Sequence, residues 1–430
     1  MSNAKCLWKD SYRQQAQEVV TALLAARTNT GWVWCYENTF WMRALQAWSD
    51  GKLQGDNIIM KALSRMTDRG LSTVEDFEAM HAEIWAEWAR ESNNQKSQWE
   101  FFVPFVMKLT DDAPRPATFS LLGTTFILDK WQATEGSIGT GNIDQAFAKD
   151  FLKVEQRPET CLSLTAEGAG SVQAWETVIP AFDLFRGLLE YVHGYGRRSM
   201  SIGGGSKSVR SIFPVPQWLL ARNASGHLEV LRFDINKSPD GNVQTLVVQA
   251  FDQIAKNAAM FADSPSKGST TALLTDAFRL YAQALDEPFR HSCLLGLWQM
   301  GETLTLSNRF NGDTKMVCAR LVATVEKRMQ PPPTGLPKIL EDIADKRNRI
   351  VHHGIHDVDD EDINILKLIC EMALWCVMHA VDKLPTKEHL NHFLTLSCRA
   401  KTDLEVMGEA LEWVYELERK LSTAKPSESP

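Results

Sequence analysis

Two patterns of apolar residues alternate along this chain and predict three successive regions. From about residue 9 to 95, apolar side chains such as Val19 and Leu23 recur at the spacing of helices with one buried face. From residue 99, short runs rich in β-branched and aromatic residues predict strands. After residue 246 every segment again has helical periodicity. The predicted helices are 38–48, 56–68, 75–92, 143–153, 171–192, 246–262, 270–286, 289–306, 313–329, 337–353, 360–383, 386–397 and 402–422, and the predicted strands are 99–109, 118–128, 160–168, 210–221 and 228–235.

These elements predict a mainly α, multidomain protein. Its parts are a helical N-terminal region (1–98), an α+β region (99–264), an all-α helical bundle (265–424) and a flexible tail (425–430). The Ser264–Ser269 segment (SPSKGS) is the candidate boundary before the bundle. The segment 360–383 is apolar nearly all round, so it is expected at the centre of the bundle.

Composition narrows the class of protein. The 430 residues are 44% hydrophobic and 23% charged, which excludes global disorder. No apolar run approaches the ~20 residues needed to cross a bilayer, and the N-terminus lacks the apolar stretch of a signal peptide. The eight cysteines include no CxxC pair, so we expect a cytoplasmic protein with buried thiols rather than a disulfide or zinc framework.

The net charge of −8 argues against a protein that coats nucleic acid, yet one stretch is locally basic. No acidic residue lies between Glu190 and Glu229, whereas this stretch contains Arg197, Arg198, Lys207, Arg210 and Arg222. It is rich in Gly and Ser and flanked by aromatic residues, a composition suited to single-stranded RNA. The alternative is a solvated loop between a helix and a strand. The GGGSKS run lacks the spacing of a nucleotide-binding P-loop.

The strongest candidate chemistry lies at 346–356, with the sequence KRNRIVHHGIH. Asn348 and His352 are four residues apart and share a helix face, and Arg347 has the reach to meet them. Gly354 is a natural stop that places the histidines in the last helical turn. Histidine transfers protons near neutral pH, arginine binds phosphate, and asparagine orients a hydroxyl or an imidazole. No metal is needed if the nucleophile is a ribose 2′-OH.

These residues resemble the signature of the HEPN superfamily, in which Arg and a polar residue precede a His at a separation of four to six residues. The run Arg347–Asn348–Arg349–Ile350–Val351–His352 matches it, preceded by MGETL at 300–304, Arg320–Leu321 and LEDIADK at 340–346. This layout is most similar to the ApeA-like branch. The SLLGTTFILDKW and FDLFRGLLEY segments upstream also resemble the region before the HEPN domain in such proteins.

The resemblance implies a metal-independent endoribonuclease without a cofactor, which cleaves RNA by 2′-OH attack and leaves a 2′,3′-cyclic phosphate. It implies that Arg347 clamps phosphate, Asn348 orients and His352 is the general base or acid. Family members usually dimerise through the HEPN helices, and many act in antiphage defence or toxin–antitoxin systems. The expected partners are therefore RNA, a second copy of the chain, and a phage-derived trigger or an antitoxin. Substrate contacts are expected from Lys346, Arg349, His353, Arg197, Arg198, Lys207 and Arg210.

Several alternatives remain open from the sequence. His353 and His356 also lie at allowed spacings from Arg347 or Arg349. The charged residues could simply cap and solvate a helix end. A metal site formed by His352, His353, His356 and Asp357 is disfavoured by the break at Gly354, and the acidic run 359–362 suits the start of a helix. Finally, the bundle could be a catalytically silent HEPN module for dimerisation or partner binding, with residues 1–264 as a sensor.

Overall fold

A computed structural model describes most of the chain. It covers residues 12–25, 27–28, 31–32, 42, 44–45, 48–49, 56–94, 97–105, 107–109, 116–130, 160–194, 211, 213, 215–216, 218–232, 244–246, 248–306, 314–329, 331 and 333–423. The chain divides into two compact units, Met1–Ser97 with Gly168–Gly170, and Gln98–Glu167 with Ser171–Pro430. Each unit has a hydrophobic core of its own.

The first unit is built mainly from α1 (Arg13–Ala25), α3 (Asp56–Asp68) and α4 (Val74–Asn94). Their buried side chains recur at helical spacing and enclose a small apolar core, which confirms the predicted helices there. Within the predicted 38–48 helix, the described residues Met42 and Leu45 are helical and buried. The short β1–β2 hairpin (Arg27–Thr28 and Gly31–Trp32) was not predicted, because two-residue strands leave no alternation to detect.

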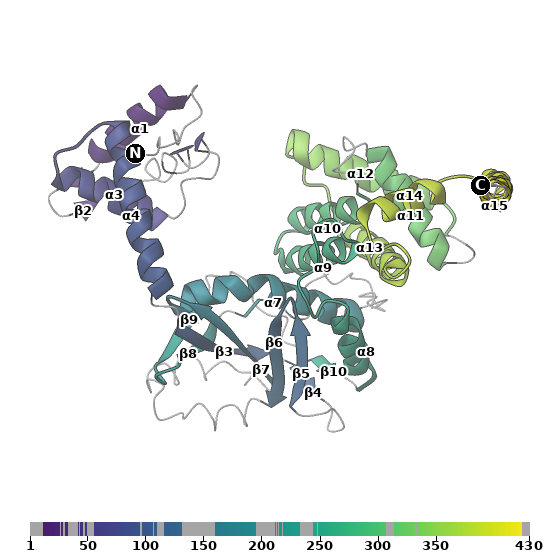
Figure 1. The fold of residues 1–430 in the computed structure, drawn as a ribbon, viewed down its shortest axis with the longest axis horizontal. Coiled ribbons are helices and arrows are strands. Elements are labelled where there is room, and N and C mark those ends of the chain that lie inside the picture. Colours follow the sequence, from purple (N-terminus) through teal and green to yellow (C-terminus); the bar gives the residue numbers. More distant parts are fainter. Residues whose placement is uncertain are drawn as a thin grey trace, which may run out of the picture. The chain divides into compact units, whose positions relative to one another are not determined.

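A six-stranded sheet begins the second unit (Figure 1), and its strand order is β5–β6–β7–β3–β8–β9. The pairs β5–β6, β6–β7, β3–β8 and β8–β9 are antiparallel. A separate parallel pair joins β4 and β10. The strands are β3 (Ser97–Phe105), β4 (Met107–Leu109), β5 (Ala117–Leu121), β6 (Thr124–Lys130), β7 (Thr160–Gly168), β8 (Trp218–Asn223), β9 (Leu228–Arg232) and β10 (Gln244–Leu246).

The predicted strands at 160–168 and 228–235 are confirmed in their main part, whereas the one at 210–221 begins too early. The single strand predicted at 118–128 is wrong: a turn at Leu122 and Gly123, both with positive φ, divides it into the antiparallel pair β5–β6. The run 99–109 falls on two strands, β3 and β4. Strand β8 starts at Trp218, and the described residues before it are not strand. The sequence places Pro214 and Pro216 there, and proline has no N–H to donate to a neighbouring strand. The predicted helix at 143–153 lies outside the described residues.

Helix α7 (Ser171–Gly194) lies along one face of the sheet (Figure 1). It continues through Pro180 without a restart. The alternation of strand side chains explains the covered face: Phe101 joins the core beneath α7, whereas its neighbour Phe102 joins a smaller cluster with Cys161 and Leu220. The sheet is therefore apolar on both faces.

From residue 248 onward, the residues that the structure describes are mainly helical, and the bounds of these helices agree closely with the predicted ones. Helix α13 is central: it packs against α9, α10, α11 and α12, and most of its residues are buried, as predicted. The helices are α8 (Val248–Ala259), α9 (Thr270–Asp286), α10 (Arg290–Leu304), α11 (Thr314–Arg328), α12 (Leu336–His353), α13 (Asp360–Ala380), α14 (Lys387–Ser397) and α15 (Lys401–Thr423).

By length and composition, α13 is apolar enough to cross a membrane, contrary to the expectation that no such segment exists. Its best window has a mean hydropathy of 1.5, but 67% of that window is buried inside the protein. The core helix of a soluble bundle meets the same criterion, so this is weak evidence for a membrane span.

A close contact between α7 and α9 joins the sheet region to the C-terminal helices. A Cβ on Gly187 would lie 2.2 Å from the carbonyl oxygen of Phe278, so only glycine allows the two backbones to approach this closely. One continuous apolar core extends from the sheet through α7 to α13. The proposed division of this unit at residues 264 and 265 stays a prediction.

A buried network of charged side chains reinforces that contact. Arg186 is fully buried and donates to Asp183, to Asp286 and to the carbonyl oxygen of Phe213. One helical turn further along α7, Glu190 accepts hydrogen bonds from the Ser211 hydroxyl and the Phe213 backbone N–H. Burial raises the pKa of Glu190 to about 7, although these hydrogen bonds and the charge of Arg186 lower it in part.

We expect this carboxyl group to make the protein less stable as the pH rises from about 4.5 to 7. In that range Glu190 ionises in the unfolded chain but stays protonated in the folded one, so the unfolded state gains relative stability. The Glu190→Gln variant should lack this term, which amounts to about 3 kcal/mol over the range. Urea unfolding at pH 4.5, 5.5, 7 and 8 measures it; parallel pH profiles of the two proteins would contradict the expectation.

Candidate functional site

Helix α12 carries Lys346, Arg347, Asn348, Arg349, His352 and His353. Leu336, Leu340, Ile343 and Ile350 are buried at helical spacing and hold one side of the helix against the bundle. Pro337 lies in the first turn, where a missing backbone N–H costs no hydrogen bond. The polar residues of the predicted motif therefore lie on the sides of α12 that the core leaves free.

Gly354 ends α12, as predicted. Its φ of 64° lies in the left-handed region, and its N–H donates to the carbonyl oxygen of Ile350 at 3.0 Å. His352 and His353 consequently occupy the last turn, and both are exposed.

Arg347 and Asn348 are in direct contact. The Arg347 Nη1 atom donates to Asn348 Oδ1 at 3.0 Å, and Arg347 Nη2 lies 3.5 Å from Glu302 Oε1 on α10. The same Glu302 oxygen accepts a hydrogen bond from Trp298 Nε1 at 2.7 Å. Glu302 was not predicted as a site residue. Its four-residue spacing from Trp298 was visible in the sequence, but its contact with Arg347 depends on how α10 and α12 pack.

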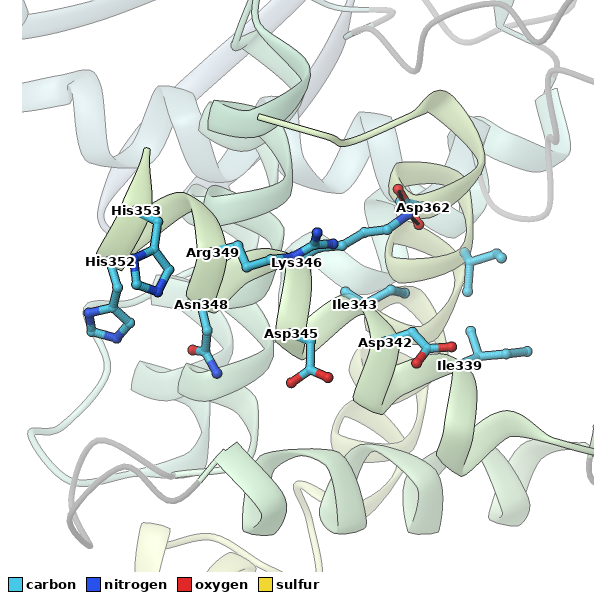
Figure 2. A pocket seen from close by; sticks show the side chains of 11 residues that line it. Ile339, Asp342, Ile343, Asp345, Lys346, Asn348, Arg349, His352, His353 and Asp362 are labelled. Atoms are coloured by element: carbon cyan, nitrogen blue, oxygen red, sulfur yellow. Dashed lines mark hydrogen bonds and ion pairs between the residues drawn. The ribbon is translucent and has the colours of Figure 1, made fainter. Parts of the chain in front are cut away.

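A cavity of about 660 Å³ runs along α12 towards α13. Figure 2 shows Asn348 and Asp345 projecting from the same side of α12, with His352 and His353 at its C-terminal end. Arg347 does not line this cavity, but it donates a hydrogen bond to Asn348, which does. The lining residues are Ile339, Asp342, Ile343, Asp345, Lys346, Asn348, Arg349, His352, His353, Asp362 and Ile365.

The two other cations of the motif are both engaged by carboxylates. Lys346 Nζ lies 2.6 Å from Asp362 of α13, and Arg349 Nη2 lies 2.6 Å from Asp357. Desolvation lowers the pKa of Lys346, but the hydrogen bond to Asp362 and the nearby carboxylates outweigh it and raise the pKa overall. A polyanion that contacts Lys346 or Arg349 must therefore compete with an existing ion pair.

The acidic run before α13 has a structural role in this fold. Asp359 and Asp362 form a reciprocal capping box, and Asp360 pairs with Arg290 of α10 at 2.8 Å. The Asp362 backbone N–H lowers the pKa of Asp359. Among the residues that the structure describes, no group of three His, Cys, Asp or Glu side chains could hold a metal ion. His356 instead packs against His291, with ring centroids 4.1 Å apart.

The predicted basic loop is only partly accounted for. Arg197, Arg198, Lys207 and Arg210 lie outside the described residues. Arg222 is described, and it is not a free cation: it pairs with Glu100 on the neighbouring strand at 2.5 Å and lies over the Phe102 ring. Because Glu100 pairs with Arg222, this arginine does not add an unpaired positive charge to the predicted basic stretch.

No protein-family model, no curated protein and no solved structure matches this chain.

Proposed function

We propose that this protein is a metal-independent endoribonuclease in which Arg347, Asn348 and His352 form the catalytic group. The observation that carries the proposal is their arrangement on the last two turns of α12. Arg347 contacts Asn348, and Asn348 lines the same cavity as the exposed His352. An orienting amide and a proton-transfer group thus line one cavity, and a phosphate-binding cation contacts the amide.

The reaction that suits this group is transesterification of RNA. The ribose 2′-oxygen forms a bond to the adjacent phosphorus, and the bond from phosphorus to the 5′-oxygen breaks. His352 takes the proton from the 2′-OH or gives one to the leaving 5′-oxygen. Arg347 neutralises charge that develops on the phosphate, and Asn348 orients the hydroxyl or the imidazole. The products are a 2′,3′-cyclic phosphate and a 5′-OH.

A homodimer brings two copies of the motif together. Transesterification needs both a base and an acid, and in a dimer the His352 of each copy would supply one of them. We propose that the C-terminal bundles of two copies pair so that two Arg347–His352 motifs line one cleft. The cellular role we propose is antiphage defence or a toxin–antitoxin system in the cytoplasm, in which a phage-derived trigger or an antitoxin controls cleavage.

The ion pairs of the motif favour a second candidate function. Arg347, Lys346 and Arg349 each contact a carboxylate, at Glu302, Asp362 and Asp357. In a silent module these contacts would only stabilise the bundle, which would then serve dimerisation or partner binding. In the enzyme they are exchanged for RNA phosphates, and this exchange offers a means of holding the nuclease inactive.

Product analysis tests the proposed nuclease. Purified full-length protein is incubated with mixed RNA in EDTA, and in parallel it is induced in bacteria with and without phage infection. We expect fragments with 2′,3′-cyclic phosphate and 5′-OH ends, since the chemistry requires no metal. Intact RNA in both settings would contradict the nuclease and support the silent module, and fragments with 5′-phosphate ends would indicate a different mechanism.

A further inference from the structure

A second cavity, of about 770 Å³, lies beside the N-terminal ends of α9 and α14. Backbone hydrogen bonds hold these two ends together: the Thr270 N–H donates to Pro385, and the Lys387 N–H donates to Gly268. Lys267 and Lys387, which are 120 residues apart in sequence, are thereby fixed on the same cavity together with Arg279 of α9. The sequence contains no local signal for this grouping.

The charges on the cavity wall are unbalanced. Among the lining residues that the structure describes, three are cationic, Lys267, Arg279 and Lys387, and one is acidic, Asp276. No described residue forms a hydrogen bond or ion pair with the Lys267 or Lys387 side chain. Arg279 approaches Asp276 only at 3.7 Å, beyond hydrogen-bond distance, and its buried Nε atom has no hydrogen-bond partner among the described residues.

This imbalance contrasts with the overall charge of the C-terminal helices. Residues 271–430, which include Asp276, Arg279 and Lys387, contain 24 acidic and 19 basic residues, and Lys346 and Arg349 on α12 are already engaged by carboxylates. Two lysines without a carboxylate partner among the described residues, beside an arginine whose Nε lacks a hydrogen-bond partner there, make this cavity a candidate site for an anion. Phosphate fits this donor set, because lysine and arginine are its usual ligands in proteins.

The remaining walls indicate a ligand larger than inorganic phosphate. The partly exposed Leu280 provides an apolar surface, backed by the buried Leu273 and Leu306, and Gln283 and Thr303 add polar groups. The volume lies within the range of ~300–1,000 Å³ that is typical of small-molecule pockets. A nucleotide combines a phosphate group for the cations with a flat base for this apolar surface.

We propose that this cavity binds a small phosphorylated nucleotide, with its phosphate held by Lys267, Lys387 and Arg279 and its base against the apolar wall at Leu280. The site is separate from the cavity along α12, and the two share no lining residue. Nucleotide binding at this cavity therefore does not require the proposed nuclease activity.

Calorimetry on the full-length protein tests the site with AMP, ADP, ATP and the GTP series, and with adenosine, inorganic phosphate and a short RNA as comparison ligands. We expect at least one nucleotide to bind, adenosine not to bind, and inorganic phosphate to bind at least ~10-fold more weakly. Affinity for the nucleotide should fall with rising salt, because the recognised group is charged.

Paired variants assign the binding to this cavity. The double change Lys267→Ala and Lys387→Ala should weaken nucleotide binding at least ~10-fold, and charge reversal to Glu should abolish it. The matched control changes Lys256 and Lys338, two lysines outside the cavity, to Ala. Circular dichroism checks that each variant is folded, and Lys→Arg replacements, which keep the charge, should restore binding. No nucleotide binding, equal binding by the double variant, or binding of RNA alone would overturn the proposal.

Discussion

The His352→Ala variant is expected to cleave RNA ~10²–10⁴-fold more slowly than the wild-type protein, because the loss of a general acid or base typically costs this much. His352 is exposed in the last turn of α12 and lines the cavity along that helix, so its removal leaves no buried void. The rate is measured by single-turnover cleavage of a labelled RNA in EDTA, at a protein concentration that saturates the RNA.

Two further variants test which histidine reacts, and a third serves as their control. His353→Ala and His356→Ala resolve the choice left open by the sequence, since all three histidines have allowed spacings from the arginines. His392→Ala is the matched control, because His392 is exposed on α14 of the same unit and lies outside the candidate site. A loss of rate in His356→Ala but not in His352→Ala would assign the role to His356. Full activity in all of them would remove the catalytic proposal.

The Arg186→Ala variant should lose about 3–5 kcal/mol of the free energy of unfolding, because removal of one partner leaves buried charges uncompensated. Arg186 is fully buried, and its guanidinium joins Asp183 of α7, Asp286 of α9 and the carbonyl oxygen of Phe213. Without it, two carboxylates remain in the core with no cation between them. Urea unfolding followed by circular dichroism measures the loss.

Lys338→Ala is the control for this prediction. Lys338 pairs with Asp342 at 2.9 Å, but both side chains are largely exposed, so solvent screens the pair. The variant should unfold at nearly the same urea concentration as the wild-type protein. If Arg186→Ala changes the midpoint no more than Lys338→Ala does, the buried network is not a major source of stability.

Local signals were sufficient to predict most helices. The start of α13 follows from the acidic run at Asp359–Asp362, whose carboxylates accept backbone N–H groups, and the end of α12 follows from Gly354. The α13 sequence also indicated its position, because a helix that is apolar on all sides is buried. Sequence patterns failed to predict the strands β1 and β2, which are only two residues long, and the position at which β8 begins.

The candidate site shows the same division. The motif itself, its helix and the exposure of His352 in the last turn were predictable, because spacing of three or four residues places side chains on one side of a helix. The partners of the motif were not. Glu302 reaches Arg347 across 45 residues of sequence, and Asp362 reaches Lys346 from the next helix. Opposite charges are common in the sequence, and only packing selects which of them meet.

The sequence by itself therefore determined the helices, their ends and the residue types offered along α12, because hydrogen bonds and apolar periodicity within a segment decide these features. The tertiary structure alone decided the strand order of the sheet, the Gly187–Phe278 approach, the carboxylate that each cation of the motif contacts and the pairing of Lys267 with Lys387 on one cavity. These features depend on contacts between segments far apart in the chain. The sequence of a single segment does not show which distant residues it will contact.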